Sequence, residues 1–206
     1  GGHPELFADV TAAALSTYGI AADKKVILFV GRLDHQKGVD VLLSAMAGVF
    51  AQRKDTILLI IGEGPVRSDL QQQVEHLQLS QYVVFLPWQE NPLPFIAAAD
   101  VVAIPSRWEG MPNLLLEAMA LERPFVVTDV EGVREVLGHI DDRQLPSPGD
   151  APALAAALLA ELGAASTSRE KAHSLQQRLL ADFSHRKMVA MYEKLYRNLI
   201  SQWEKR

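Results

Sequence analysis

Two glutamates, Glu109 and Glu117, stand eight residues apart around a predicted helix start. The apolar stretch 101–104 predicts a buried strand before them, and Pro112 suits the first helical position because the backbone N–H that proline lacks is not needed there. Carboxylates accept hydrogen bonds from hydroxyl groups, and the free N–H groups of a helix start bind anions. This combination therefore suits a ligand with both hydroxyls and phosphate, and a nucleotide-sugar is such a ligand.

A second polar loop follows the first predicted strand and supplies positive charge. Gly31 lets the backbone approach a ligand closely, and Arg32 and Lys37 bring two cations to the same rim. Gly38 opens the next helix, whose N-terminus adds a positive dipole end. The arrangement suits phosphate, although its spacing matches neither a P-loop nor a dinucleotide-binding fingerprint. Taken alone, the loop is weak evidence, because an arginine at a strand end more often forms a surface ion pair than a ligand contact.

The composition excludes several classes of protein. The chain has 206 residues, of which 49% are hydrophobic, so it can form a substantial core. It has no cysteine, which excludes disulfides and thiolate metal sites, and its six histidines lack metal-ligand spacing. The net charge of −5 argues against general nucleic-acid binding. We find no serine-hydrolase motif, no signal peptide and no apolar run of about 18 residues that would predict a membrane span.

Charge is unevenly distributed along the chain. Residues 1–165 hold 11 basic and 21 acidic residues, whereas residues 166–206 hold 9 basic and 4 acidic ones. A solvated basic face on the terminal helices explains this, and contact with an acidic partner domain or an anionic membrane surface is the alternative. The last predicted helix also has an apolar stripe that ends near Trp203 and predicts packing or self-contact.

Apolar stretches alternate with amphipathic ones, which predicts an α/β fold. We expect a doubly wound, Rossmann-like parallel sheet of about six strands with a helical C-terminal tail. Ligands of such sheets bind at the carboxyl ends of the strands, where this sequence has glycine, proline or polar residues. The predicted strands are 25–30, 56–61, 82–86, 100–104, 124–128 and a small one at 143–145. The predicted helices are 11–18, 39–53, one around Leu70 and Val74, 94–99, 112–121, 133–137, 152–162, 168–182 and 185–203.

These segments together resemble the carboxy-terminal, donor-binding domain of glycosyltransferase family 4, the group 1 transferases of GT-B fold. The two glutamates match the family's E-x7-E motif, and the basic loop matches as Gly31-Arg32-Leu33 with Lys37-Gly38. The resemblance covers roughly residues 25–137. Further matches are Gly62-Glu63-Gly64-Pro65, Phe85-Leu86-Pro87, Ala99-Asp100-Val101 before Pro105-Ser106, and residues 128–135.

The resemblance implies a role for each matching residue. Arg32 and Lys37 would hold the donor diphosphate, Glu109 would accept hydrogen bonds from the donor sugar, and Glu117 would take the ribose hydroxyls. The first three are the candidate catalytic residues. Many relatives have glycine where Pro112 stands, so phosphate would have to use neighbouring amides here. The other donor-binding candidates are Gly31, Gly38, Glu63, Gly64, Leu86, Pro87, Trp88, Ser106, Gly110, Met111, Asn113 and Leu114.

The resemblance also implies a division of the chain. Residues 1–24 would be a linker and short helix from an interdomain region, and residues 25–165 the Rossmann-like nucleotide-sugar-binding domain. Residues 166–206 would complete that domain and reach toward an amino-terminal domain. The chain starts with Gly1, and we expect it to be a piece of a longer protein or a cut form of one.

The function implied is that of a retaining, metal-independent glycosyltransferase acting on a nucleotide diphosphate sugar. We expect no cofactor, and the donor could be of the UDP, GDP or ADP type. The acceptor would be a glycan or lipid-linked acceptor, such as lipopolysaccharide or another surface glycan, bound through the amino-terminal domain. We expect a cytoplasmic location, at the inner face of the membrane with peripheral contact to it.

Two other functions fit the same residues. A nucleotide-sugar epimerase of GT-B fold is the first, and product analysis with and without an acceptor separates it from a transferase. A non-catalytic nucleotide-binding or interaction module is the second, because a fold alone proves no function. The co-occurrence of Arg32, Lys37, Glu109 and Glu117 argues against the second.

Overall fold

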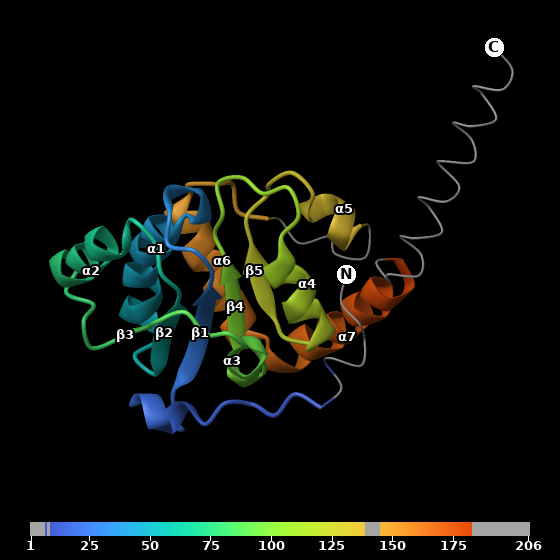
Figure 1. Cartoon of the computed structure of the whole chain (residues 1–206), viewed down its shortest axis with the longest axis horizontal. Helices are drawn as coiled ribbons and strands as arrows, with labels where there is room; N and C mark the ends of the chain where they lie inside the picture. The colour runs from blue at the N-terminus through green and yellow to red at the C-terminus, as the bar shows by residue number, and fades with distance from the viewer. Residues whose placement is uncertain (1–6, 8, 139–144, 183–206) are drawn as a thin grey trace, which may run out of the picture.

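A computed structural model describes residues 7, 9–138 and 145–182 of the protein. A parallel five-stranded sheet forms the centre of the described part. Its strands consist mostly of valine, isoleucine, leucine and phenylalanine, which pack well when both faces of a sheet are buried. The spatial order is β3-β2-β1-β4-β5 (Figure 1). The strands are β1 (Lys25–Val30), β2 (Thr56–Ile61), β3 (Val83–Leu86), β4 (Val101–Ile104) and β5 (Phe125–Val127).

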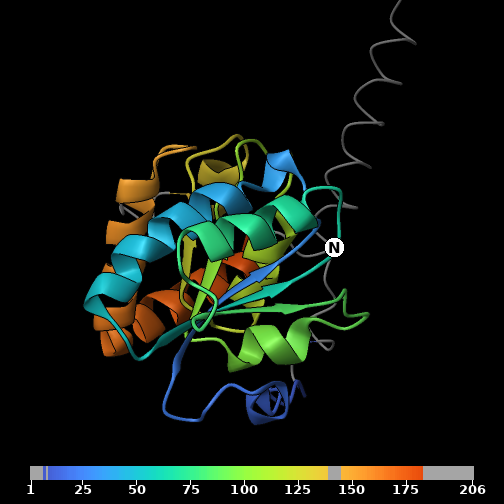
Figure 2. The same ribbon diagram turned by 90° about the vertical axis from the view of Figure 1, so that its left-hand side faces the viewer.

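Helices cover both faces of the sheet. Alternate residues of β1 enter two separate cores: Ile27 and Phe29 pack toward α1 and α6, whereas Val26 and Leu28 pack toward α3 and α4. Figure 2 shows α1 and α2 on one side of the strands and α3 on the other. The helices are α1 (Val39–Gln52), α2 (Arg67–His76), α3 (Leu93–Ala98), α4 (Asn113–Ala120), α5 (Val133–Leu137), α6 (Ala151–Gly163) and α7 (Ala165–Asp182), with short 3-10 turns η2 (Leu15–Tyr18) and η3 (His35–Lys37).

The strand order creates a crevice between β1 and β4. After β1 the chain builds outward through β2 and β3, and it then crosses back so that β4 pairs with the free side of β1, with Ile27 opposite Val101. The loops that leave β1 and β4 therefore diverge from neighbouring strands at one edge. This topological switch point is where open α/β sheets bind their ligands.

The fold class predicted from the sequence is confirmed, with differences in detail. The described sheet has five strands rather than about six, and most of the predicted strand 143–145 lies outside the described residues, as does the predicted helix 185–203. The prediction that Pro112 is the first residue of a helix is wrong by one position. Its ψ of 86° is not helical, so Pro112 caps α4, which begins at Asn113. In the described part of the chain, no helix combines the length and hydrophobicity needed to cross a bilayer.

Candidate functional site

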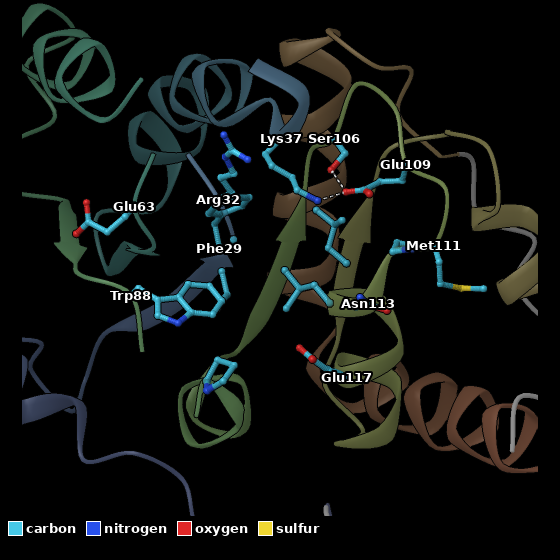
Figure 3. Close-up of a pocket in the computed structure, with 16 residues that line it drawn as sticks. Phe29, Arg32, Lys37, Glu63, Trp88, Ser106, Glu109, Met111, Asn113 and Glu117 are labelled. Carbon is cyan, nitrogen blue, oxygen red and sulfur yellow. Dashed lines mark hydrogen bonds and ion pairs between the residues drawn. The ribbon is translucent and has the colours of Figure 1, made fainter. Parts of the chain in front are cut away.

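A pocket of about 580 Å³ opens at the carboxyl edge of the sheet, between the loops that follow β1 and β4. Figure 3 shows its lining side chains, which come from strand ends, loops and helix α4, far apart in the sequence. The lining residues are Phe29, Val30, Gly31, Arg32, Lys37, Glu63, Trp88, Pro92, Ile104, Ser106, Glu109, Met111, Pro112, Asn113, Leu114 and Glu117. The predicted basic loop and the predicted glutamates thus meet in one cavity.

Most, but not all, of the residues predicted from the sequence line this pocket. The three candidate catalytic residues Arg32, Lys37 and Glu109 do so, and so do eight of the other candidates: Gly31, Glu63, Trp88, Ser106, Met111, Asn113, Leu114 and Glu117. Five candidates do not line it, namely Gly38, Gly64, Leu86, Pro87 and Gly110. The side chain of Met111 points away from the pocket in Figure 3, so Met111 faces the cavity with its backbone.

Lys37 and Glu109 form an ion pair across the crevice, although 72 residues separate them in the sequence. The hydroxyl of Ser106 donates a second hydrogen bond to Glu109, at 2.9 Å. The Glu109 side chain is only 9% exposed, and burying a carboxylate is costly unless it is paired. Ser106 is held in turn because the buried hydroxyl of Thr128 donates to its carbonyl oxygen at 2.6 Å. The cluster is therefore a fixed polar group at the end of β4.

Glu117 lies differently, on the pocket side of α4. No hydrogen bond or ion pair joins its carboxylate to any other residue in the described part of the chain. Burial raises the pKa of Glu117, because the partly buried carboxylate has lost some of its hydration. Figure 3 shows the carboxylate pointing into the pocket. An acceptor of this kind, desolvated and still available, can bind the hydroxyls of a ligand.

The opposite wall carries an exposed aromatic ring and a second charged group. Trp88 is 54% exposed and lies across the pocket from Glu117 (Figure 3), which leaves its ring face available for stacking. Arg32 stands at the rim with its side chain 71% exposed, and it forms a loose ion pair of 3.4 Å with Asp34. The rim therefore offers an exposed cation, whereas the cation at Lys37 is paired with a buried carboxylate.

Glycines at two loop ends allow close backbone approach instead of lining the pocket. A Cβ atom on Gly38, which has a φ of +65°, would lie 2.1 Å from the carbonyl oxygen of Pro105. A Cβ atom on Gly64 would lie 2.1 Å from the carbonyl oxygen of Leu33. Both contacts are far shorter than any real Cβ contact, so these positions require glycine for loop packing. Neither glycine lines the pocket, and the donor-binding role expected for them stays a prediction.

Arg67 is a residue of the site region that the sequence analysis missed. Its guanidinium donates to the carbonyl oxygens of Gly62 at 2.6 Å and Leu86 at 3.4 Å, and it pairs with Glu63 at 3.1 Å. It therefore ties the carboxyl ends of β2 and β3 together. The spacing of four residues from Glu63, at the start of a helix, is the signal that could have found it.

Apolar residues of the pocket floor were also missed. Phe29, Val30 and Ile104 are the last residues of β1 and β4, and Pro92 and Pro112 each precede a helix. The sequence marks the strand ends and Pro92 as structural, because such residues look the same whether or not a ligand lies beside them, whereas Pro112 is the position where many relatives have glycine. Their place beside the pocket follows from the strand order alone.

Together, the fold and the pocket define a class of protein: a Rossmann-like α/β domain with a polar ligand pocket at its switch point. Comparison with known proteins gives the family. Residues 24–163 match the family model described as glycosyl transferases group 1. The chain belongs to this family.

Individual relatives are moderately similar and longer. The N-acetyl-alpha-D-glucosaminyl L-malate synthase of Bacillus anthracis is 28% identical over 89% of this chain and 48% of its own length. The lipopolysaccharide core biosynthesis glycosyltransferase LpsD of Rhizobium meliloti is 33% identical over 66% of this chain and 39% of its own. The chain thus spans half or less of the length of these relatives.

Solved structures share the fold. HepE from Anabaena, determined in complex with UDP and glucose, superposes with a TM-score of 0.81 at 22% sequence identity. The match covers 98% of this chain and 55% of the HepE chain. The predicted GT-B type of Rossmann-like domain is therefore confirmed as the fold.

Proposed function

We propose that this chain is the donor-binding half of a glycosyltransferase that uses a nucleotide diphosphate sugar. The observation that carries the proposal is one pocket that holds a cation at Lys37, a buried carboxylate at Glu109 and, at Glu117, a partly desolvated carboxylate that no other described residue pairs with. Such a pocket meets the needs of a ligand with phosphate at its centre and hydroxyls on both sides. Family membership supports the same reading.

The proposed roles follow from where the charges lie. Lys37 and the start of α4 would face the diphosphate, with Arg32 closing on it from the rim. Glu117, far along α4, would accept from the ribose hydroxyls, and Trp88 would flank the base. Glu109 would accept from hydroxyls of the transferred sugar, since within the described part of the chain both of its side-chain contacts are made by Oε1 and its other carboxylate oxygen is left for a ligand.

The proposed mechanism stabilises the leaving group by fixed positive charge. Cleavage of the bond between sugar and diphosphate leaves additional negative charge on the phosphate in the transition state. Lys37, Arg32 and the N-terminal amides of α4 would stabilise that charge without requiring a metal ion, and removing one such donor costs about 10²–10³ in rate. Retention of anomeric configuration is part of the proposal, on the ground of the family resemblance.

The acceptor is proposed to be a surface glycan or a lipid-linked precursor. LpsD, by its name, acts in lipopolysaccharide core biosynthesis. An acceptor of this kind would be bound mainly by another part of the full-length protein, and peripheral contact with a membrane would bring the enzyme to it.

Calorimetric titration of the chain with UDP, GDP and ADP tests the proposal. We expect saturable binding of at least one nucleotide, and we expect Glu117→Ala and Lys37→Ala to weaken it. Glu75→Ala, an exposed glutamate on α2, is the control and should leave the affinity unchanged. Failure of all three nucleotides to bind would favour an interaction module instead.

A further inference from the structure

Arg107 connects the loop after β4 to the loop after β1. Its backbone N–H donates to the carbonyl oxygen of Gln36 at 2.8 Å, and its Nη1 donates to the carbonyl oxygen of His35 at 2.9 Å. The same guanidinium forms a bidentate pair with the carboxylate of Asp40, at 2.8 and 2.6 Å. Arg107 thus contacts two residues of the opposite loop, His35 and Gln36, and one residue in the first turn of α1, Asp40.

These contacts surround the ion pair of the pocket without being part of it. Gln36 and Asp40 lie on either side of Lys37 in the sequence, and Arg107 lies two residues before Glu109. Arg107 itself does not line the pocket. Gln36 returns a further contact, because its amide donates to the carbonyl oxygen of Trp108 at 3.0 Å. The segments that carry the cation and the carboxylate are therefore fixed to one another just outside the cavity.

The geometry of the Arg107–Asp40 pair suits a fixed spacer. Two parallel N–H···O bonds between a planar guanidinium and a carboxylate restrict both distance and orientation, which a single lysine contact does not. The Arg107 guanidinium holds the pKa of Asp40 below its usual range, so the pair stays charged at neutral pH. Gly38 allows the close approach of the two loops, with no room for a side chain against Pro105.

We propose that Arg107 is a positioning residue: through Asp40 and the backbone of residues 35 and 36 it holds Lys37 and Glu109 at the separation that a diphosphate sugar requires. This inference rests on the proposed function of the pocket. We call the contacts of Arg107 with His35, Gln36 and Asp40 the clamp. Loss of the clamp should weaken binding of the phosphates, which Lys37 would contact. It should not weaken binding of the nucleoside, which Trp88 and Glu117 would contact.

The test compares UDP with uridine on the full chain by calorimetry. We expect Arg107→Ala to weaken UDP binding about tenfold, the loss associated with one misplaced charge-assisted hydrogen bond, and to leave uridine binding unchanged. Arg107→Lys should give an intermediate loss, because lysine restores the charge but not the bidentate geometry. Asp40→Asn should resemble Arg107→Ala.

Arg53→Ala is the matched control. Arg53 forms a bidentate pair with Asp55 at 3.0 and 2.8 Å, at the other end of α1 from Asp40. We expect Arg53→Ala to lower the unfolding temperature about as much as Arg107→Ala does. It should leave the affinities for UDP and uridine unchanged. Thermal unfolding of every variant accompanies the titrations.

Each outcome decides the matter. Equal affinity of Arg107→Ala and the unsubstituted chain for UDP overturns the inference and leaves the proposed function intact. Equal losses for UDP and uridine also overturn it, since they indicate general loosening of the site. If the unsubstituted chain binds none of UDP, GDP and ADP, the proposed function fails, and the inference fails with it. If GDP or ADP binds in place of UDP, that nucleotide and its nucleoside are the probes.

Discussion

At the scale of single residues, the two glutamates of the E-x7-E motif differ in what surrounds them. Glu109 is buried and paired with Lys37 and Ser106, so its charge is compensated within the protein. The Glu117 carboxylate is partly buried and no other described residue pairs with it, so its charge is not compensated. The same residue type thus carries a compensated charge at one position and an uncompensated charge at the other.

Replacing Glu117 by glutamine should stabilise the protein at neutral pH. Below the ordinary pKa the carboxyl is protonated in both the folded and the unfolded chain, and its burial costs little. Because burial raises the pKa in the folded state, the unfolded chain ionises first as the pH rises, and folding stability falls until the raised pKa is passed. Thermal unfolding of Glu117→Gln should therefore show a higher midpoint than the unsubstituted chain at pH 7. This difference in midpoint should shrink as the pH is lowered toward 4.5, the ordinary pKa of a glutamate.

The same substitution should impair the pocket. Loss of a charged acceptor for two hydroxyls should weaken nucleotide binding by about 1.5–3 kcal/mol, roughly ten- to a hundredfold. Glu75→Gln on the exposed face of α2 is the control for both measurements. A stability gain without a loss of affinity would remove Glu117 from the proposed site.

Lys37 and Glu109 should prove strongly coupled. Lys37→Ala leaves a nearly buried carboxylate with only a serine partner, so we expect a loss of about 2–3 kcal/mol in the free energy of unfolding. Glu109→Gln removes the charge that needs a partner, and the double variant should lose less than the sum of the single losses. Denaturant unfolding of the four proteins measures the coupling energy. Additive losses would show that the pair contributes nothing beyond its separate residues.

At the scale of elements, the site depends on how closely two loops approach one another. Gly38 has a φ of +65° and faces the Pro105 carbonyl, so Gly38→Ala combines backbone strain with a clash. We expect it to cost about 2–4 kcal/mol of unfolding free energy, measured by denaturant titration. Gly19, with a φ of +78° and nothing near its missing Cβ, isolates the strain, and Gly19→Ala should cost about 1 kcal/mol. Equal costs would mean that the loops are not tightly packed.

Local sequence pattern predicts the elements, because apolar period and length are local properties. The stretch 56–61, all of it buried, is a strand by composition alone, and the helix over 39–52 follows from its apolar stripe. Boundaries are less certain, as Pro112 shows: its fixed φ fits both a first helical residue and a cap, and only its ψ distinguishes them.

Contacts across the crevice have no local signal. The Lys37–Glu109 pair spans 72 residues and the Arg107–Asp40 pair spans 67, and nothing near either residue marks its partner. What the sequence does show is that both loops follow strands, which places them at one edge once the sheet is parallel. The gathering of Arg32, Lys37 and the glutamates could therefore be predicted, whereas the clamp and the packing role of Gly38 required the strand order.

At the scale of the whole molecule, the pocket has an open side. Trp88, which lines the pocket, and Trp108, which precedes the pocket residue Glu109, are each more than half exposed. The chain spans 48% of the Bacillus anthracis relative and 55% of HepE. If the chain is the donor-binding half of a glycosyltransferase, as proposed, the other half of that enzyme would cover this rim.

Binding and transfer should therefore separate in this chain. The groups proposed to bind the nucleotide all lie in the described pocket, so UDP at about 100 times its Kd should raise the free energy of unfolding by roughly 2.7 kcal/mol. Sugar transfer needs in addition an acceptor site and exclusion of water from the reacting bond, for which the exposed rim provides no cover. We expect the chain to transfer no glucose from UDP-glucose to an added acceptor glycan, as measured by chromatography of the products. The reaction is run at a nucleotide concentration at which the stabilisation against unfolding is saturated. The full-length protein is the positive control, and efficient transfer by the 206-residue chain alone would show that the pocket is a complete active site.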